Sequence, residues 1–356
     1  MRPVPDRTAT LEPRDPVDAP APPRLVDHSG RYELVCEHAR GGLGRIVRAV
    51  DRWLGREVAV KELLSHDARH QARLLREAFI TARLQHPGIV TVHEAGHWPT
   101  GEPYYVMKFV PGRTLKELFA ERTALRERLA LLPHVIALAE AIGYAHGEGV
   151  IHRDVKPSNV IVGTFGETVV VDWGLALDGS EDFTGEVVGT PAYMAPEQAR
   201  GEPVDERADV YALGVILYEL IAGAAPYGST SDGVLARVVE GPPPELAVRG
   251  APRELVAIVE RAMARDRELR HRDARELAAE LRRFRDRQRP HRAAAPLRHL
   301  AVAAAVALGG FGMRALRAPH ETCPPPAQHP ARVVHVHAWG HDVAVAEEPA
   351  ATCHGT

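Results

Sequence analysis

The chain has 356 residues, of which 45% are hydrophobic and 26% are charged. These fractions are typical of globular domains, so they exclude wholesale disorder, a collagen-like chain and a multi-span membrane protein. With 47 acidic and 44 basic residues the net charge is −3, which gives no overall positive field for binding nucleic acid. The three cysteines are far apart, so no disulfide framework is expected in the main body, for which a reducing compartment is the default.

The first part of the chain is predicted to be rich in strands. Residues 1–30 are rich in proline and lack hydrophobic periodicity, which predicts a disordered leader. Ala68–Gln85 shows helical spacing of apolar residues, and Pro87 stops it. Around this helix, short runs of β-forming residues predict strands over 31–36, 46–52, 57–61, 90–94 and 104–109.

The part after Pro111 is predicted to be mainly helical. Apolar residues recur at helical spacing from Val135 to Ile142, which predicts one amphipathic helix. A second run, Asp209–Gly223, is apolar almost all round but is interrupted by Glu219, which favours a buried core helix over a membrane span. The last helical segment is expected to end near Phe284.

The C-terminal region divides into three segments. Arg282 to Arg298 contains seven arginines against one acid, which predicts a basic linker over 286–299. The uncharged run that follows is shorter than the roughly 20 residues of a bilayer span, so a membrane-tethering helix over 300–316 and a surface amphipath both remain open. Residues 317–356 are rich in Pro, His and Ala, which predicts a disordered tail. His335–His337 has the pattern of a transition-metal site, although no close pair of cysteines supports that interpretation.

A glycine-rich segment, Ala39–Ile46, lies between two predicted strands. Gly41, Gly42 and Gly44 would let the backbone approach phosphate groups and donate N–H groups to them. An ordinary hairpin turn explains the same pattern, so the segment alone is weak evidence.

Lysine is rare in this chain. Of the 44 basic residues only four are lysine, so a lysine marks a place that needs a compact point charge. Lys61 lies on an alternating strand, and a lysine on a buried strand face requires an anion, for which Glu77 on the following helix is the nearest candidate. A purely structural ion pair is the alternative.

The strongest motif is Ile151–Asn159. Within it Asp154 is suited to accept a proton from a hydroxyl, and Lys156 is suited to neutralise a phosphoryl group. Asn159 supplies an amide oxygen for a hard cation, and Asp172, after an apolar strand, is suited to bind the same Mg²⁺.

Taken in order, the glycine-rich loop, VAVK, REA, HRDVKPSN, DWG and GTPAYMAPE resemble the eukaryotic-like (bacterial) Ser/Thr protein kinase family over about residues 31–285. The resemblance implies an α+β, two-lobed protein-kinase fold. It would have a small antiparallel-sheet N-lobe with one helix (31–107), a hinge (108–112) and a larger, mainly helical C-lobe (113–285).

The resemblance also implies residue roles. Lys61 would bind ATP phosphates and pair with Glu77, Asp154 would be the catalytic base assisted by Lys156, and Asn159 and Asp172 would hold Mg²⁺ (or Mn²⁺). The other positions expected around ATP are Ala39, Gly41, Gly42, Gly44, Ile46, Ala59, Met107, Phe109 and Val110. Two supporting contacts are expected as well, an ion pair between Glu197 and Arg270 and an anchor for the catalytic loop at Asp209.

Regulation is implied by Arg153, which precedes the expected base. In the family that this chain resembles, such an arginine meets a phosphate on the segment between Asp172 and Glu197. Thr184 is the first candidate phosphosite and Ser180 the second. A solvated loop with incidental hydroxyl groups is the alternative.

The function implied is a protein serine/threonine kinase that uses ATP and acts on protein substrates, with a cytoplasmic kinase domain and a candidate anchor at 300–316. Lys156 and Thr190 favour Ser/Thr over Tyr acceptors. Two departures from the family pattern, Ala39 in place of glycine and Trp173 in place of phenylalanine, leave a nucleotide-binding pseudokinase scaffold as the alternative. The sequence specifies neither the protein substrate nor the oligomeric state.

Overall fold

The computed structural model describes residues 30–41, 44–65, 67–178, 185, 187–228 and 233–288, together with the backbone of 332–338 and 341–347. Residues 1–29 of the predicted leader, 289–299 of the basic linker and the whole 300–316 segment lie outside the described residues. The chain divides after Pro290 into two units, and each is described by itself.

The N-terminal lobe is built on a five-stranded sheet in the order β1-β2-β3-β5-β4, in which every neighbouring pair is antiparallel. Val58 and Val60 of the central strand are fully buried, because alternate residues of a strand face the same side of a sheet. The strands are β1 (Tyr32–Arg40), β2 (Gly44–Asp51), β3 (Arg56–Leu63), β4 (Val92–His97) and β5 (Pro103–Lys108).

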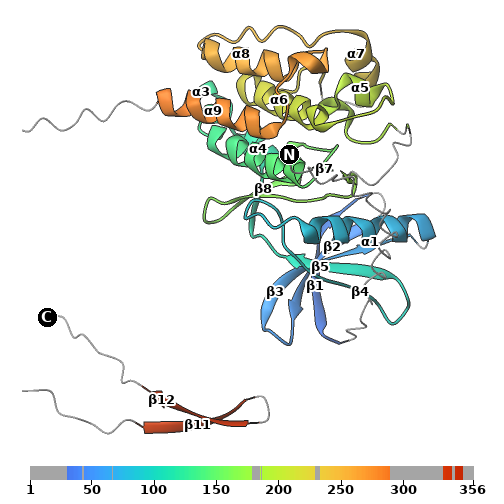
Figure 1. Cartoon of the computed structure of the whole chain (residues 1–356), viewed down its shortest axis with the longest axis vertical. Helices are drawn as coiled ribbons and strands as arrows, with labels where there is room; N and C mark the ends of the chain where they lie inside the picture. Colours follow the sequence, from blue (N-terminus) through green and yellow to red (C-terminus); the bar gives the residue numbers. More distant parts are fainter. Residues whose placement is uncertain are drawn as a thin grey trace, which may run out of the picture. The chain divides into compact units, whose positions relative to one another are not determined.

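One helix, α1 (Ala68–Arg83), packs against this sheet (Figure 1). It begins after Asp67, whose side chain accepts a hydrogen bond from the backbone N–H of Arg69 and so satisfies one of the free donors of the first turn. It buries Leu74, Glu77 and Ala78, among others. The helix ends two residues before the predicted Gln85, because Leu84 already has extended backbone angles.

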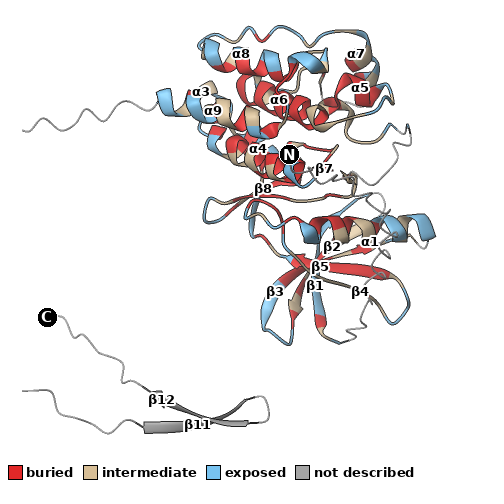
Figure 2. Ribbon diagram, viewed as in Figure 1, coloured by how far each residue is buried: buried red, intermediate tan, exposed pale blue. Residues whose placement is uncertain are grey.

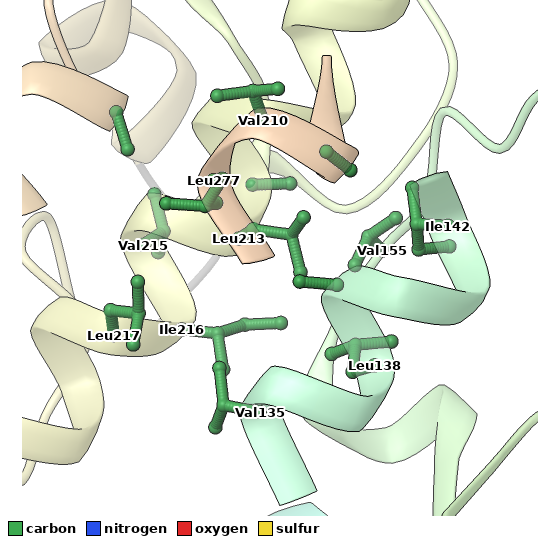
Figure 3. Packing of buried hydrophobic residues seen from close by; sticks show 14 of the residues in the cluster. Val135, Leu138, Ile142, Val155, Val210, Leu213, Val215, Ile216, Leu217 and Leu277 are labelled. Carbon is green, nitrogen blue, oxygen red and sulfur yellow. The ribbon is translucent and has the colours of Figure 1, made fainter. Parts of the chain in front are cut away.

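The C-terminal lobe is mainly helical and holds the largest apolar core (Figure 2). Its centre is α6, which packs against α4 and α9 through residues such as Leu213, Ile142 and Leu277 (Figure 3). The helices are α2 (Leu115–Glu121), α3 (Leu125–Leu129), α4 (Leu132–Gly147), α5 (Pro196–Ala199), α6 (Glu206–Ala222), α7 (Val234–Glu240), α8 (Arg253–Ala262) and α9 (Ala274–Gln288), with three single 3₁₀ turns at η1 (Pro157–Asn159), η2 (Pro191–Tyr193) and η3 (Arg267–Leu269).

The apolar character of two helices in this lobe is explained by their burial in the core. By length and composition Leu125–Gly147 could cross a membrane, but α4 within it is packed into the core, as the sequence also predicted for α6. α9 ends at Gln288, four residues beyond the predicted Phe284, and Phe284 is buried on its packed face.

Short strand pairs support the loops that face the N-terminal lobe. β6 (Gly112–Thr114), β8 (Val160–Gly163) and β9 (Thr168–Val170) form a three-stranded sheet, and β7 (Val150–Ile151) pairs with β10 (Leu177–Asp178). Gly112 permits the close approach of β6 to β8, since a Cβ atom there would lie 2.3 Å from the carbonyl oxygen of Val162.

The second unit contains a β-hairpin, β11 (Arg332–Ala338) paired with β12 (His341–Glu347). The sequence predicts a disordered tail over 317–356, and these two strands lie within that range. Both have valine at alternate positions, and the two residues between them include Gly340, a pattern typical of a tight hairpin.

Candidate active site

A cavity of about 570 Å³ lies between the N-terminal sheet with α1 and the loops that follow β7 and β9. Gly44 lies at the start of β2, where a Cβ atom would be only 2.6 Å from the carbonyl oxygen of Glu62, so a larger residue would push the glycine-rich turn away from β3. Of the predicted site residues, the cavity is lined by Ala39, Gly41, Gly44, Ile46, Lys61, Glu77, Asp154, Lys156, Asn159 and Asp172.

Lys61 joins two acidic groups from different elements. Its Nζ lies 2.6 Å from Glu77 Oε1 on α1 and 2.9 Å from Asp172 Oδ1, which follows β9. Glu77 also accepts a hydrogen bond of 2.8 Å from the hydroxyl group of Tyr105 on β5. The predicted pairing of Lys61 with Glu77 is thus present, and Asp172 completes a three-residue cluster.

The opposite charges of Lys61 and Asp172 stabilise each other. Burial disfavours the charged form of Lys61, but the negative groups around it outweigh this effect and raise its pKa well above the ordinary value. The partial removal of the Asp172 carboxylate from water would raise its pKa, but the neighbouring Lys61 ammonium lowers it to about 2. For Glu77 burial prevails, reinforced by the charge of Asp172, and its pKa is raised.

The loop after β7 presents a second group of polar residues. Thr190 Oγ1 donates to Asp154 Oδ1 over 2.7 Å, and Lys156 Nζ donates to Asp154 Oδ2 and, over 2.8 Å, to Thr190 Oγ1. Asn159 Nδ2 donates to the carbonyl oxygen of Asp154 over 3.1 Å. Asp154 and Asn159 are both buried, so each is held in one position by its hydrogen bonds.

The backbone of this loop is held in place by Asp209 on α6. Its carboxylate accepts hydrogen bonds from the backbone N–H groups of His152 (2.8 Å) and Arg153 (2.9 Å), and from His146 Nε2 at 3.0 Å. Arg153 has a φ of 64°, which is uncommon for a residue with a side chain. The bonds to Asp209 therefore hold the loop in a backbone conformation that it would otherwise seldom adopt.

An apolar cluster adjoins the polar end of the cavity. Ala59 and Met107 lie opposite each other across β3 and β5 and are buried together with Val110. Phe109 and Ile46 are partly buried against the same cluster. The predicted apolar residues of an adenine site are thus gathered in one place, next to the cluster of charged groups.

The donor set fits a hard divalent cation. Asp172 has a side chain 44% exposed on the cavity side of the Lys61 pair, and it has a φ of 65°. The amide nitrogen of Asn159 is used in bonds to Asp154, which leaves the amide oxygen for a ligand. Mg²⁺ is a hard cation that binds oxygen donors, commonly one or two carboxylates together with phosphates and water.

Some predicted residues lie outside this description, and some contacts were not predicted. Gly42, Ser180 and Thr184 lie outside the described residues. The contact of Tyr105 with Glu77 was missed, although Tyr105 and Met107 are two residues apart on one strand and so share a face. The sequence does, however, predict the buried Glu197–Arg270 pair, which is present at 2.6 and 2.9 Å.

Comparisons with known proteins point to one family. Residues 32–294 match the family model described as "Protein kinase domain". The chain is 38% identical over 298 residues to a probable serine/threonine-protein kinase of Streptomyces coelicolor, with 80% of this chain and 43% of the relative covered. It is 39% identical over 268 residues to the serine/threonine-protein kinase PknB of Mycobacterium tuberculosis, covering 71% of this chain and 42% of the relative. The chain thus spans less than half the length of these two relatives.

A solved structure shows the same architecture. The crystal structure of the Mycobacterium tuberculosis PknI kinase domain aligns with a TM-score of 0.57 and 29% identity, covering 71% of this chain and 96% of that one. The antiparallel N-terminal sheet with one helix and the larger helical lobe confirm the predicted two-lobed fold. By its matched sequence and its fold, the chain belongs to the protein kinase domain family.

Proposed function

We propose that this protein is an ATP-dependent protein serine/threonine kinase. The observation that carries the proposal is the convergence of two groups on one cavity. Lys61 is paired with Glu77 and Asp172, and Asp154 and Asn159 line the same cavity from the opposite lobe. The similarity to proteins named serine/threonine-protein kinases supports the same activity.

In the proposed reaction the hydroxyl oxygen of a serine or threonine forms a bond to the γ-phosphorus of ATP. The bond between that phosphorus and the bridging oxygen breaks, ADP leaves, and the hydroxyl proton passes to Asp154. Lys156, which donates to Asp154 and Thr190, would neutralise negative charge on the transferred group. Lys61 would hold the α- and β-phosphates, with Glu77 fixing its position.

Asn159 and Asp172 are the residues that we propose hold Mg²⁺, and Mn²⁺ would suit the same oxygen donors. When bound, the cation neutralises charge on the phosphate oxygens. The glycine-rich turn would cover the phosphates, and Ala59, Met107 and Val110 would enclose adenine beside the backbone of the linker between the lobes.

The proposal favours an active enzyme over a scaffold. Neither departure from the family pattern removes a charged participant, because Ala39 and Trp173 stand in place of uncharged residues. Ala39 lines the cavity, and Trp173 is fully buried beside His152. Support for an active enzyme comes from the cavity lining, which includes Lys61, Glu77, Asp154, Lys156 and Asp172.

We further propose that phosphorylation between Asp172 and Glu197 regulates the enzyme, with Thr184 as the first acceptor and Ser180 as the second. Arg153 supports this proposal, because its Nε donates to the carbonyl oxygen of Leu175 and thereby places a guanidinium group beside the start of that segment. A phosphate there would add about −2 charge for the guanidinium to bind.

We also propose that 300–316 tethers a cytoplasmic kinase domain to a membrane. Support comes from the arginine-rich stretch that precedes the apolar run. Carbonate-resistant sedimentation of the full chain, compared with a 1–295 truncation, would test the tether. Equal release of both proteins would exclude it.

Incubation of the purified full chain with radiolabelled ATP and Mg²⁺ tests the main proposal. We expect label on serine or threonine of the chain itself, with Thr184 and Ser180 examined by mass spectrometry, and at least about 100-fold slower labelling with Asp154→Asn. Calorimetric binding of ADP without any transfer would instead identify a scaffold.

A further inference from the structure

Phe109, the aromatic residue of the hinge (108–112) between the lobes, is contacted by both strands that carry the glycine-rich turn. The ring of His38 on β1 meets it edge to face, with ring centroids 5.3 Å apart and an angle of 81° between the planes. The guanidinium carbon of Arg48 on β2 lies 5.3 Å from the centroid of the same ring. Two strands and the hinge are therefore joined through one side chain.

The chemistry of this contact is favourable. Aromatic rings prefer edge-to-face geometry at this separation, because the positive ring edge meets the negative ring face. A guanidinium over an aromatic face is attracted by the same charge distribution. Arg48 Nε is shielded from solvent without a hydrogen-bond partner in the described part of the chain, as expected for a group that rests against a ring.

The position of the contact links it to the nucleotide cleft. His38 directly precedes Ala39, which lines the cavity, and Arg48 is paired across the sheet with Ala59 in the adjoining apolar cluster. Phe109 itself lies between Met107 and Val110, both buried in that cluster. Movement of the β1–β2 hairpin away from the hinge would separate His38 and Arg48 from Phe109.

We propose that His38, Phe109 and Arg48 form a latch that holds the β1–β2 hairpin against the hinge and so sets the affinity for the nucleotide. His38 and Arg48 act here as positioning residues through Phe109. The proposal rests on the proposed kinase function for its choice of ligand. It adds two residues, both outside the catalytic motifs, that determine how tightly the nucleotide is retained.

The latch is tested in the full chain by the affinity for ADP, measured by calorimetry, and by the KM for ATP. Arg48→Met, which also removes an exposed ion pair with Glu57, and His38→Ala should each weaken ADP binding and raise KM by about three- to tenfold, with kcat little changed. His38→Phe keeps an aromatic edge and should restore most of the affinity. Arg52→Met is the matched control, since Arg52 is an exposed arginine of the same lobe that pairs with Glu33 and should leave both values unchanged.

A double-mutant cycle between His38→Ala and Phe109→Leu separates the latch from general loosening of the lobe. We expect the two changes together to weaken ADP binding by less than the product of their single effects. Independent effects, or ADP affinities equal to that of the unaltered chain, would overturn the latch. Because ADP binding needs no phosphoryl transfer, a chain that binds ADP but does not phosphorylate would refute the kinase and leave the latch standing. A chain that binds no ADP would refute both.

Discussion

Lys61 Nζ lies 2.9 Å from Asp172 Oδ1, although 111 residues separate the two in the chain. Lys61 belongs to the sheet of the N-terminal lobe and Asp172 follows a strand of the C-terminal lobe. The contact therefore spans the two lobes and makes the cluster sensitive to their separation.

Asp154→Asn should lower the rate of autophosphorylation by about 10²- to 10⁴-fold, because the amide cannot accept the hydroxyl proton. The variant should keep its fold, since an amide oxygen can still accept the hydrogen bond from Thr190. Phosphate incorporation measures the loss, and unchanged circular dichroism together with unchanged ADP binding provides the control. A rate equal to that of the unaltered chain would remove Asp154 from the role of base.

Lys61→Arg should lower kcat/KM for ATP by about 100-fold. A planar guanidinium cannot occupy the place of a compact ammonium between Glu77 and Asp172 without displacing one of them. Lys116→Arg is the matched control, because Lys116 is an exposed lysine on α2. Steady-state kinetics of both variants provide the comparison, and similar values for the two would contradict a specific role of Lys61.

The Lys61–Asp172 pair should make stability depend on pH only under acid conditions. The folded-state pKa of Asp172, about 2, lies below the ordinary value of 3.8, so its contribution is complete above about pH 5 and is lost as pH falls through about 2. The stability advantage of the unaltered chain over Asp172→Asn should therefore shrink as pH falls from about 5 to 2. Urea unfolding over this range measures the difference in unfolding free energy; a difference that stays constant from pH 5 to 2 would show that the pKa of Asp172 is not lowered.

Ala39→Gly should lower the KM for ATP by about two- to fivefold with kcat unchanged. The methyl group of Ala39 lies on the cavity wall, and its removal lets the backbone come closer to a phosphate. Initial rates at varied ATP concentration test this. A higher KM would mean that the added freedom of the loop outweighs the closer approach.

Arg270→Met should destabilise the folded protein by about 3–5 kcal/mol, since it leaves the buried carboxylate of Glu197 without its bidentate partner. Arg287→Met, which removes an exposed pair with Glu254, should cost less than about 1 kcal/mol. Chemical denaturation of both variants measures the contrast, and equal losses would show that burial of the first pair contributes nothing.

The sequence predicted well those parts of the site that lie within single motifs. Strand alternation predicts the position of Lys61, and helical spacing predicts that of Glu77. Asp154 and Asn159 lie on one short loop. Alternation and helical spacing fix which face a residue shares with its neighbours, so local pattern was sufficient here.

Contacts that depend on how separate elements meet could not be predicted in this way. Tyr105 reaches Glu77, and His38 reaches Phe109, only because of the strand registers and the placement of α1. The start of β4 shows the same limit. The predicted strand began at Val90, but β4 begins at Val92, and an irregularity between Val92 and Glu94 shifts its pairing with β5.

The hydrogen bonds from the loop backbone to Asp209 divide the site into a fixed half and a movable half. Asp154 and Asn159 belong to a loop that is hydrogen-bonded to the buried helix α6, whereas Lys61 lies on the sheet of the N-terminal lobe and Glu77 on the helix packed against that sheet. A compound wedged between the lobes would thus separate Lys61 from Asp172 while leaving the hydrogen bonds of Asp154 and Asn159 in place. Such a compound would act by separating residues of the two lobes. Its release would restore the site without any refolding of the loop that carries Asp154 and Asn159.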